Sequence, residues 1–343
     1  MDVVSLGLAH EEDMIEPQVS FQSDVRPIKI CGGGNFTALL LENGLLYVAG
    51  EIPFDVDLQQ TLPTNQNSWV HVPGQFTDVA CGWAHIVVVD QNGIVFTAGA
   101  GDKGELGQSK VRKSPKFAPI LSTQQNSEKA QVFACFYNTY ILSGGILYGC
   151  GSNTKCQLQN VKSRAIDTLE IISPCSAIVS ACVGKNFVCF VEKSGNIHIR
   201  GALSGYKTQI QQQSSGDMSL DLKAMWTSIT SLDGQKFSFY GSARLYQNVI
   251  AASQFEKPVT AWNTGSEHGI ACVDKKAVFC WGWGEHGNCG PIATTKAIDG
   301  INDGSNINSN VNLTYDANCH SSDATVYACF GGCATTWICI EYK

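Results

Sequence analysis

Three glycines in the last quarter of the chain have the spacing of a phosphate-binding loop. Residues 280–291 read CWGWGEHGNCGP, in which Gly282, Gly284 and Gly287 spell G-x-G-x-x-G. Dinucleotide-binding enzymes place such glycines between a strand and a helix, whose N-terminus then meets the pyrophosphate. Here Pro291 and an Asn/Ser/Asp-rich tract follow instead of a helical pattern. The residues therefore argue against a nucleotide site and favour a tight turn that needs a positive φ.

The same glycine spacing recurs elsewhere in the chain. Gly99, Gly101 and Gly104 follow the segment FTDVACGWAHIVVVDQNGIVFTA, again after an apolar run of period two. A third copy, AQVFACFYNTYILSGGILYGCGSNTKCQL, has Thr154 in the last slot. After Gly104 the chain runs into two prolines rather than a helix. A loop that recurs in this way is typical of a structural repeat.

Seven repeat units span the chain, with a spacing of mostly about 40–55 residues. Each unit has an apolar run, a small turn, a second apolar run, a Gly-containing hairpin signal such as QNG, a third run and a Gly-rich loop. The residues that end the first apolar run are Cys31, Cys81, Cys135, Cys182, Met225, Thr264 and Phe330. Four short strands per unit, with almost no helical periodicity, predict an all-β, seven-bladed β-propeller. We expect residues 1–343 to form one such domain.

Composition and charge exclude several functional classes. The chain of 343 residues has 23 basic and 30 acidic residues, hence a net charge of −7, which disfavours nucleic acids and anionic membranes as partners. The start MDVVSLGLAHEEDM does not resemble a signal peptide. The 15 cysteines lie in apolar runs without any C-x-x-C spacing, which predicts free thiols and no metal site. We expect an intracellular protein without a cofactor, in the cytoplasm, with the nucleus as a second candidate location.

The segment VACGWAHIVVVDQNGIVFTAGAGDKGELG resembles a repeat of the regulator of chromosome condensation family, whose members are seven-bladed propellers. More narrowly, several stretches resemble the fungal killer-toxin-insensitivity propellers of this family, also called alpha-tubulin suppressors. These stretches are GCGSNTKCQLQ, MWTSI, TGSEHGI, CWGWGEHGNCGP and FGGCATTWI. The resemblance implies a non-enzymatic partner, in a heterodimer, of the small zinc-ribbon electron-donor protein that serves diphthamide synthesis. It also implies an indirect role in the Elongator-dependent modification of wobble uridines in tRNA.

Two segments depart from the family pattern. Members begin with a strand before a Leu-Gly pair, whereas Leu6 and Gly7 follow only MDVVS here. This predicts that the first strand is missing or vestigial, so that the blade containing the C-terminal run WICIEYK exposes an edge. The second departure is the polar stretch 300–323, GINDGSNINSNVNLTYDANCHSSD, which we expect to be a disordered loop insertion.

Strand order predicts which residues face a partner. Successive antiparallel strands put the first turn and the Gly-rich loop of a unit at the same end of the blade. Exposed Trp beside His and Glu is typical of a protein-binding hot spot. The candidate partner-binding residues are Trp83, Asn153, Lys155, Trp226, Glu267, Trp283, Glu285 and His286, with the turn at 331–333 on the same face.

Other conspicuous side chains are better explained as structural. His85 and His268 occupy one repeat slot, as do Asn35 and Asn186, which predicts hydrogen bonds within their blades. Trp281 and Trp337 follow strand positions and are expected in the core. No Ser/His/Asp or Cys/His set has the spacing of a catalytic group, so we do not expect an enzyme.

Two functions therefore remain open. The first is an adaptor or regulator that binds the zinc-ribbon protein and, indirectly, serves Elongator and the diphthamide machinery. The alternative is a guanine-nucleotide exchange factor for a small GTPase, a role of other propellers in the wider family. The acidic balance and the lack of a basic N-terminal tail disfavour a chromatin-bound exchange factor. They do not exclude exchange on another GTPase.

Overall fold

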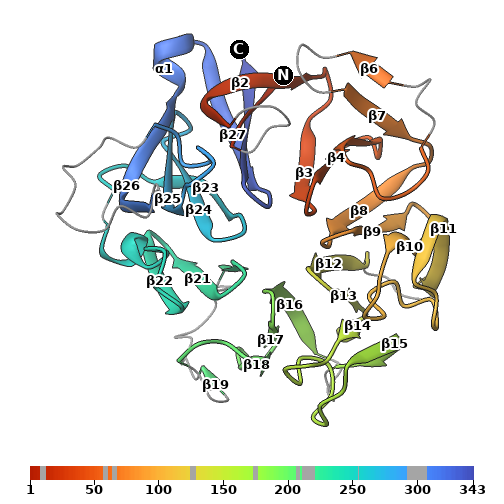
Figure 1. Cartoon of the computed structure of the whole chain (residues 1–343). Coiled ribbons are helices and arrows are strands. Elements are labelled where there is room, and N and C mark those ends of the chain that lie inside the picture. The colour runs from red at the N-terminus through yellow and green to blue at the C-terminus, as the bar shows by residue number, and fades with distance from the viewer. Residues whose placement is uncertain are drawn as a thin grey trace. The chain divides into compact units, whose positions relative to one another are not determined.

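The structure is a computed structural model that describes residues 1–7, 13–56, 61–63, 68–123, 129–172, 177–205, 209–210, 221–253, 255–291 and 307–343. These residues form two compact units. Unit 1 comprises Met1–Asp24 and Ser228–Lys343, and unit 2 comprises Val25–Thr227. Both consist almost entirely of antiparallel sheets, as Figure 1 shows with the strands labelled.

Unit 2 contains four sheets whose strands follow one another in the chain. The first has the order β3-β4-β5-β7-β6 and the others run β8 to β11, β12 to β15 and β16 to β19. Their bounds are β3 (Pro27–Gly32), β4 (Phe36–Leu41), β5 (Leu46–Gly50), β6 (Thr61–Pro63), β7 (Ser68–Val72), β8 (Phe76–Cys81), β9 (His85–Asp90), β10 (Ile94–Ala100), β11 (Lys113–Ser122), β12 (Gln131–Cys135), β13 (Asn138–Ser143), β14 (Ile146–Ser152), β15 (Ala165–Ile171), β16 (Ile178–Val183), β17 (Phe187–Glu192), β18 (Ile197–Gly201) and β19 (Gln209–Ile210). The short strand β20 (Asp221–Ala224) ends this unit.

Unit 1 contains two four-stranded sheets and a hairpin. The sheets have the orders β2-β1-β28-β27 and β23-β24-β25-β26, and β21 pairs with β22. The bounds are β1 (Asp2–Gly7), β2 (Met14–Gln22), β21 (Ser228–Asp233), β22 (Lys236–Gly241), a 3-10 helix η2 (Val249–Ala252), β23 (Val259–Thr264), β24 (His268–Val273), β25 (Ala277–Trp283), β26 (Ile307–Asp316), α1 (Ala317–His320), β27 (Ala324–Gly331) and β28 (Thr335–Tyr342).

The predicted repeat grammar matches the sheets. The first, second and third apolar runs of a repeat form three neighbouring antiparallel strands, as in β8, β9 and β10. The second strand is buried along its whole length in β24 and along all but its last residue in β9. Its run is therefore continuously apolar rather than alternating. The hairpin glycines adopt the positive φ that the turns require, for example +74° at Gly93 and +87° at Gly195.

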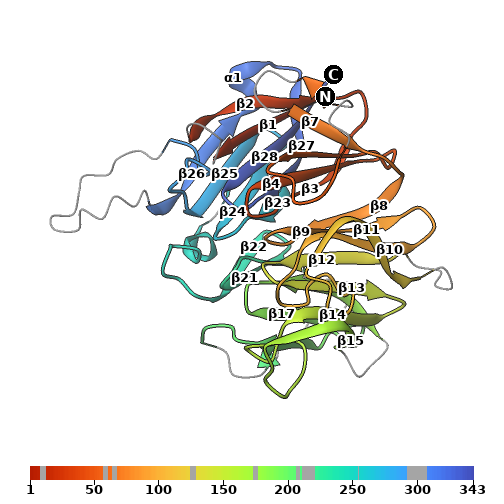
Figure 2. The ribbon, with the colours of Figure 1, turned by 45° about the vertical axis from the view of Figure 1, so that its right-hand side comes forward.

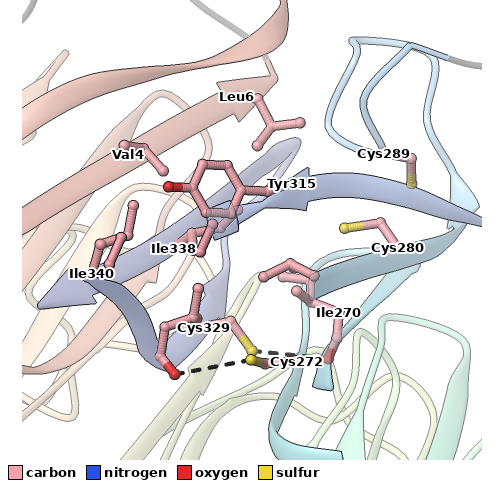
Figure 3. Close-up of a cluster of buried hydrophobic side chains, with 14 residues drawn as sticks. Val4, Leu6, Ile270, Cys272, Cys280, Cys289, Tyr315, Cys329, Ile338 and Ile340 are labelled. Atoms are coloured by element: carbon pink, nitrogen blue, oxygen red, sulfur yellow. Dashed lines mark hydrogen bonds between the residues drawn. The ribbon is translucent and has the colours of Figure 1, made fainter. Parts of the chain in front are cut away.

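The core of each unit lies between the faces of its sheets. In unit 1, Leu6 and Val4 of β1 pack with side chains of β24, β25, β26, β27 and β28, as Figure 3 shows. Thiols fill part of this core: the Cys272 Sγ approaches the Val326 carbonyl oxygen and the Cys329 Sγ approaches that of Ile270, at 3.9 and 4.0 Å. Trp281 and Trp337 are 0% and 4% exposed, which confirms their predicted place in the core.

The prediction of a missing first strand is wrong. Residues 2–7 are themselves that strand: β1 pairs with β28 from Asp2 opposite Ile340 to Gly7 opposite Thr335. The segment β2 then pairs with the other side of β1, so the sheet has four strands (Figure 2). Leu6 is fully buried. The run DVVSLG supplies six ladder positions, so β1 occupies the edge that we expected to be open.

The prediction of a disordered loop over 300–323 is also wrong for its described part, 307–323. Residues 307–316 form β26, which pairs with β25, and Ala317–His320 form α1. Tyr315 and Thr314 are buried, and the Thr314 hydroxyl donates to the Cys289 carbonyl oxygen at 2.9 Å. Pairing with β25 and these contacts override the low strand propensity of the Asn-rich sequence. The start of the predicted loop, 300–306, lies outside the described residues.

Candidate functional site

Backbone hydrogen bonds join the first turns of the sheets in unit 2. The amide of Gly34 donates to the Trp83 carbonyl oxygen at 2.8 Å, and the amide of Trp83 donates to that of Phe136 at 2.9 Å. The amide of Lys185 donates to the Trp226 carbonyl oxygen at 2.9 Å. Each of these residues follows the first strand of its repeat. The repeat therefore places their side chains beside one another.

An aromatic group with a lysine forms at these turns, and we call it the Trp83 cluster: Trp83, Phe136, Lys185 and Trp226. The rings of Trp83 and Phe136 stack, with centroids 5.0 Å apart and an interplanar angle of 15°. The Trp226 ring meets Phe136 edge-on at 4.6 Å. Trp83 is 41% exposed. The structure thus brings together the predicted residues Trp83 and Trp226.

The ammonium group of Lys185 lies over this aromatic group. Its Nζ is 4.2 Å from the centroid of the Phe136 ring and 5.9 Å from that of Trp226. Lys185 itself is exposed. A cation at this distance is attracted by the ring quadrupole, by about 0.5–1 kcal/mol at an exposed site. The cluster therefore presents both an apolar ring surface and a positive charge.

The backbone of Phe136 is strained. Its φ is +50°, in the left-handed region that a bulky side chain disfavours. It begins a two-residue turn between β12 and β13, a position that Asn or Gly usually occupies. The cost is on the order of 1–2 kcal/mol. Such strain concentrates at functional sites, and here it holds the ring between the two tryptophans.

Sequence reasoning missed Phe136, Lys185 and the neighbouring Tyr137, which is 39% exposed. The signal was present, because these residues lie in the first turns after Cys135 and Cys182, as Trp83 lies in the first turn after Cys81. Only a comparison of the first turns of all repeats finds these residues, because their types alone do not mark them.

Asn153 and Lys155 do not join the Trp83 cluster as predicted. Asn153 is fully buried, and its Oδ1 accepts from the amides of Leu158 and Gln159 at 2.9 and 3.0 Å. Its side chain therefore organises the Gly-rich loop after β14, and the prediction of a partner contact is wrong for it. Lys155 is exposed in the same loop, and its predicted contact stays a prediction.

A second aromatic group lies in unit 1 and is called the Trp283 group: Trp283, Glu285, His286 and Asp13. The Trp283 Nε1 donates to the Glu285 carboxylate at 3.1 Å, and the Trp283 and His286 rings meet edge-on at 5.3 Å. The His286 Nδ1 is 3.1 Å from both carboxylate oxygens of Asp13. The structure thus brings the predicted residues Trp283, Glu285 and His286 together, and their polar atoms bond to one another or to Asp13.

Glu267 is not at the surface as predicted. Its residue is 6% exposed, and its Oε2 accepts from the Gln247 side chain at 2.9 Å. A carboxylate buried in this way needs its internal partner, so Glu267 cannot serve a docking protein without a loss of stability. The prediction of a partner contact is wrong for this residue.

His85 and His268 form hydrogen bonds between sheets, not within their own as predicted. His85 of β9 bonds through Nε2 to the Thr139 hydroxyl of β13 at 2.8 Å, and this hydroxyl donates to the Glu105 carbonyl oxygen at 2.7 Å. The same arrangement recurs in unit 1, where His268 bonds to Thr336, which donates to the Asn288 carbonyl oxygen. Each threonine hydroxyl already donates its hydrogen to a carbonyl oxygen. Each histidine Nε2 must therefore donate to the threonine hydroxyl oxygen. Burial lowers the pKa of both histidines to about 4, so both are neutral at pH 7.

The Asn pair that shares a repeat slot makes the same backbone contact in both sheets, since the Asn35 carbonyl oxygen accepts from the Glu51 amide at 2.8 Å. The Asn35 side chain donates to the Glu51 carboxylate at 2.8 Å within its own sheet. The Asn186 carbonyl oxygen accepts from the Ala202 amide at 2.9 Å. Both contacts lie beside the first turn of a sheet.

The glycine loops are structural turns. Gly99 and Gly282 have φ of +111° and +91°, and a Cβ on either would lie 2.5 Å from the carbonyl oxygen of the residue just before the neighbouring strand. After Gly104 the chain continues through turns into β11, without a helix to bind a phosphate. The buried Glu105 in this loop has a pKa raised by burial. Its carboxylate accepts from the Lys103 amide at 2.7 Å, so it closes its own turn.

Within the described ranges, no group of three or more His, Cys, Asp or Glu side chains is arranged to hold a metal ion. The cysteines of these ranges are free thiols. None of the helices described is long and apolar enough to cross a membrane.

Comparisons with known proteins agree with this architecture, although no family model matches the chain. An RCC1 repeat-containing protein of Schizosaccharomyces pombe is 25% identical over 98% of this chain and 95% of its own length. A secretion-regulating guanine nucleotide exchange factor of Bos taurus is 30% identical over 110 residues, which are 30% of this chain and 23% of that protein.

Among solved structures, human WBSCR16 aligns over the whole of both chains with a TM-score of 0.72 at 15% identity. Prp20p of Saccharomyces cerevisiae aligns over 100% of this chain and 92% of its own, with a TM-score of 0.51 at 14% identity. These likenesses confirm the predicted fold, an all-β, seven-bladed propeller.

Proposed function

Because the chain is an RCC1-repeat β-propeller protein, we propose that it acts as a non-enzymatic adaptor built around the Trp83 cluster. Its partner is the small zinc-ribbon electron-donor protein of diphthamide synthesis. Through this heterodimer it supports the Elongator-dependent modification of wobble uridines in tRNA. The likeness of the motifs in residues 149–159, 225–229 and 280–291 to the killer-toxin-insensitivity propellers supports this choice of partner.

The observation that carries the proposal is the exposure of Trp83 within a preorganised aromatic group. Stacking on Phe136 fixes the indole, while two-fifths of the residue remains open to solvent. A rigid aromatic ring loses little entropy on binding, and such rings dominate the energetics of protein interfaces. In this proposal the strained backbone of Phe136 holds its ring in the binding position in the absence of the partner.

The charge of the cluster suits the proposed partner. Lys185 is exposed above the rings and would meet an acidic or neutral surface better than a basic one. In this proposal the metal-bearing end of an acidic or neutral zinc-ribbon protein lies against the rings. Burial of the lysine against a carboxylate of the partner would add specificity.

Titration calorimetry of the purified pair tests the proposal. We expect Trp83→Ala to weaken binding about 30- to 1,000-fold, the loss typical of a central tryptophan at an interface. The matched control is Asn92→Ala, in the exposed β9–β10 hairpin, where the side chain bonds only to Asp90. Its affinity should equal that of the wild type. Equal affinities for all three proteins would contradict the proposed interface, and no binding by the wild type would contradict the proposed partner.

A guanine-nucleotide exchange factor is the second candidate, favoured by the 30% identity of 110 residues to the bovine exchange factor. Release of a fluorescent guanine nucleotide from a panel of small GTPases distinguishes the two functions. Stimulated release that is lost in Trp83→Ala would assign exchange to the Trp83 cluster and replace the adaptor proposal. Unchanged release across the panel supports the adaptor.

A further inference from the structure

Two thiols from successive repeats lie against each other in unit 2. The Sγ atoms of Cys31, at the end of β3, and Cys81, at the end of β8, are 3.1 Å apart. They occupy the same repeat slot 50 residues apart in the chain. A disulfide needs a separation of about 2.05 Å, so a shift of about 1 Å would join them. Neither is among the residues that we assign to partner binding.

We propose that Cys31 and Cys81 are a reversible redox site that closes to a disulfide when the protein meets hydrogen peroxide. The two thiols differ in access: Cys31 is half-buried, whereas Cys81 is 5% exposed. An oxidant from solvent therefore reaches Cys31 first, and Cys81 is held beside it as the second thiol. This is the arrangement of a sensor cysteine with a resolving cysteine.

The chemistry balances in two steps. The Cys31 thiolate attacks one peroxide oxygen, the O–O bond breaks, and the leaving hydroxide takes a proton to become water. The Cys81 sulfur then attacks the Cys31 sulfenic acid, the S–O bond breaks, and the second hydroxide leaves as water with the proton of the Cys81 thiol. Two thiols and one peroxide thus give one disulfide and two waters, and a dithiol reductant reverses the change.

The surroundings fit this assignment of roles. Burial and the neighbouring Cys31 raise the pKa of the Cys81 thiol well above its usual range, so Cys81 is a poor first nucleophile. Lys29 opposes this rise in part, because its ammonium group favours a thiolate nearby. The Lys29 Nζ is fixed by Asp78 at 2.7 Å and by the Val132 carbonyl oxygen at 3.3 Å. A cation is therefore held beside the pair.

The site connects to the Trp83 cluster through the backbone. The turn after Cys31 contains Gly34, whose amide donates to the carbonyl oxygen of Trp83, two residues after Cys81. A disulfide would covalently join the strands that lead into these two turns. Oxidation would thereby be sensed at Trp83.

Another thiol pair provides an internal control. Cys182 and Cys189 lie directly opposite each other on β16 and β17 of one sheet, and both are buried. They are adjacent like Cys31 and Cys81, but neither of them is partly exposed as Cys31 is. If access decides the reaction, this pair stays reduced under the same conditions.

The test is disulfide mapping of the purified full-length protein. The protein is exposed to hydrogen peroxide in native buffer, its remaining thiols are alkylated, and its peptides are analysed by mass spectrometry without reduction. We expect a linked peptide pair containing Cys31 and Cys81, in at least about tenfold excess over any other link, which a dithiol reductant removes. Cys31→Ser and Cys81→Ser should both abolish it.

The mapping in the wild-type protein decides the matter even if a variant fails to fold. A link between Cys182 and Cys189 at the same yield would show that proximity alone suffices and would overturn the proposal. So would a link from Cys81 to Cys135, or Cys31 found as sulfinic acid with Cys81 alkylated. Tryptophan fluorescence recorded during oxidation should change in the wild type and stay constant in Cys31→Ser. A constant signal in both would contradict the connection to Trp83.

Discussion

The Trp83 cluster of unit 2 and the Trp283 group of unit 1 look equivalent in the sequence but differ in where their polar atoms bond. In the Trp283 group, the indole N–H bonds to Glu285 and His286 bonds to Asp13. In the Trp83 cluster, the rings pack on one another and a lysine ammonium group lies above them. The polar side-chain atoms of the Trp283 group therefore hydrogen-bond within the group. The Trp83 cluster instead presents a ring face and a positive charge to a partner.

The comparison teaches that composition alone does not make a docking surface. A Trp directly after a glycine and shortly before a His occurs in both places, at Trp83 and at Trp283. Only at Trp83 do the backbone turns set aromatic rings against one another. In unit 2 this depends on the chain of backbone hydrogen bonds from Gly34 to Trp83 and from Trp83 to Phe136.

The largest expected difference concerns the affinity for the zinc-ribbon partner. Trp226→Ala should weaken binding about 30- to 1,000-fold, whereas Trp283→Ala should change it less than about threefold, because Trp283 already has internal partners. Calorimetric titration of both variants measures this. Equal losses would show that the two groups form one interface and would break the distinction drawn here.

The next effect should be the same in both units, because it arises from the repeated buried histidines. His85 and His268 have folded pKa values of about 4 against 6.5 in the unfolded chain. Their neutral forms are thus favoured by folding, and this stability is complete above pH 6.5 and lost as the pH falls towards 4. From pH 7 to pH 5 we expect a loss of about 2 kcal/mol per histidine.

Urea unfolding at several pH values measures this loss. His85→Asn and His268→Asn should each make the unfolding free energy fall less between pH 7 and pH 5, because each variant removes one histidine that is protonated on unfolding. This holds whatever the stability of the variants at pH 7. A slope that neither variant alters would mean that these histidines do not control the acid sensitivity.

Backbone strain provides a smaller test that is specific to unit 2. Glycine adopts the φ of +50° at position 136 without penalty, whereas alanine retains the strain. Phe136→Gly should therefore be more stable than Phe136→Ala by about 1 kcal/mol, although both lose the stacked ring. Thermal denaturation compares the two. Both should bind the partner about tenfold more weakly than the wild type, and an alanine variant as stable as the glycine variant would refute the strain.

The smallest expected effect concerns the ion pair of unit 1. Asp13 and His286 are both partly exposed, with side chains 40% and 32% accessible, so solvent screens their interaction. Asp13→Asn should lower the unfolding free energy by less than about 0.5 kcal/mol and leave partner affinity unchanged. A loss of affinity would instead place the Trp283 group in the interface.

The sequence determined the repeat, and with it most of the fold. Apolar runs of period two or of continuous burial, separated by glycine turns, specify antiparallel strands locally, and their recurrence specifies blades. The glycines at 99 and 282 could be read as turns for the same reason, since only a residue without Cβ fits beside the neighbouring carbonyl. The core positions of Trp281 and Trp337 followed from strand parity.

What the sequence could not determine depends on contacts between segments far apart in the chain. The Asn-rich run at 307–316 forms a strand because it pairs with β25 and because the Thr314 hydroxyl donates to the Cys289 carbonyl oxygen. Residues 2–7 become the inner neighbour of β28 only because the two ends of the chain meet in one sheet. Asn153 and Glu267 have residue types typical of a surface contact, but both are buried in the folded protein.

The candidate site divides in the same way. Its location at the first turns follows from the repeat, because every unit places the same slot at the same end of its sheet. Its composition does not follow, since the stacking of Trp83 on Phe136 and the placement of Lys185 over Phe136 join residues about 50 positions apart and depend on ring geometry. Local sequence determines where a turn lies, whereas only the packed sheets decide which side chains meet there and which retain an open face.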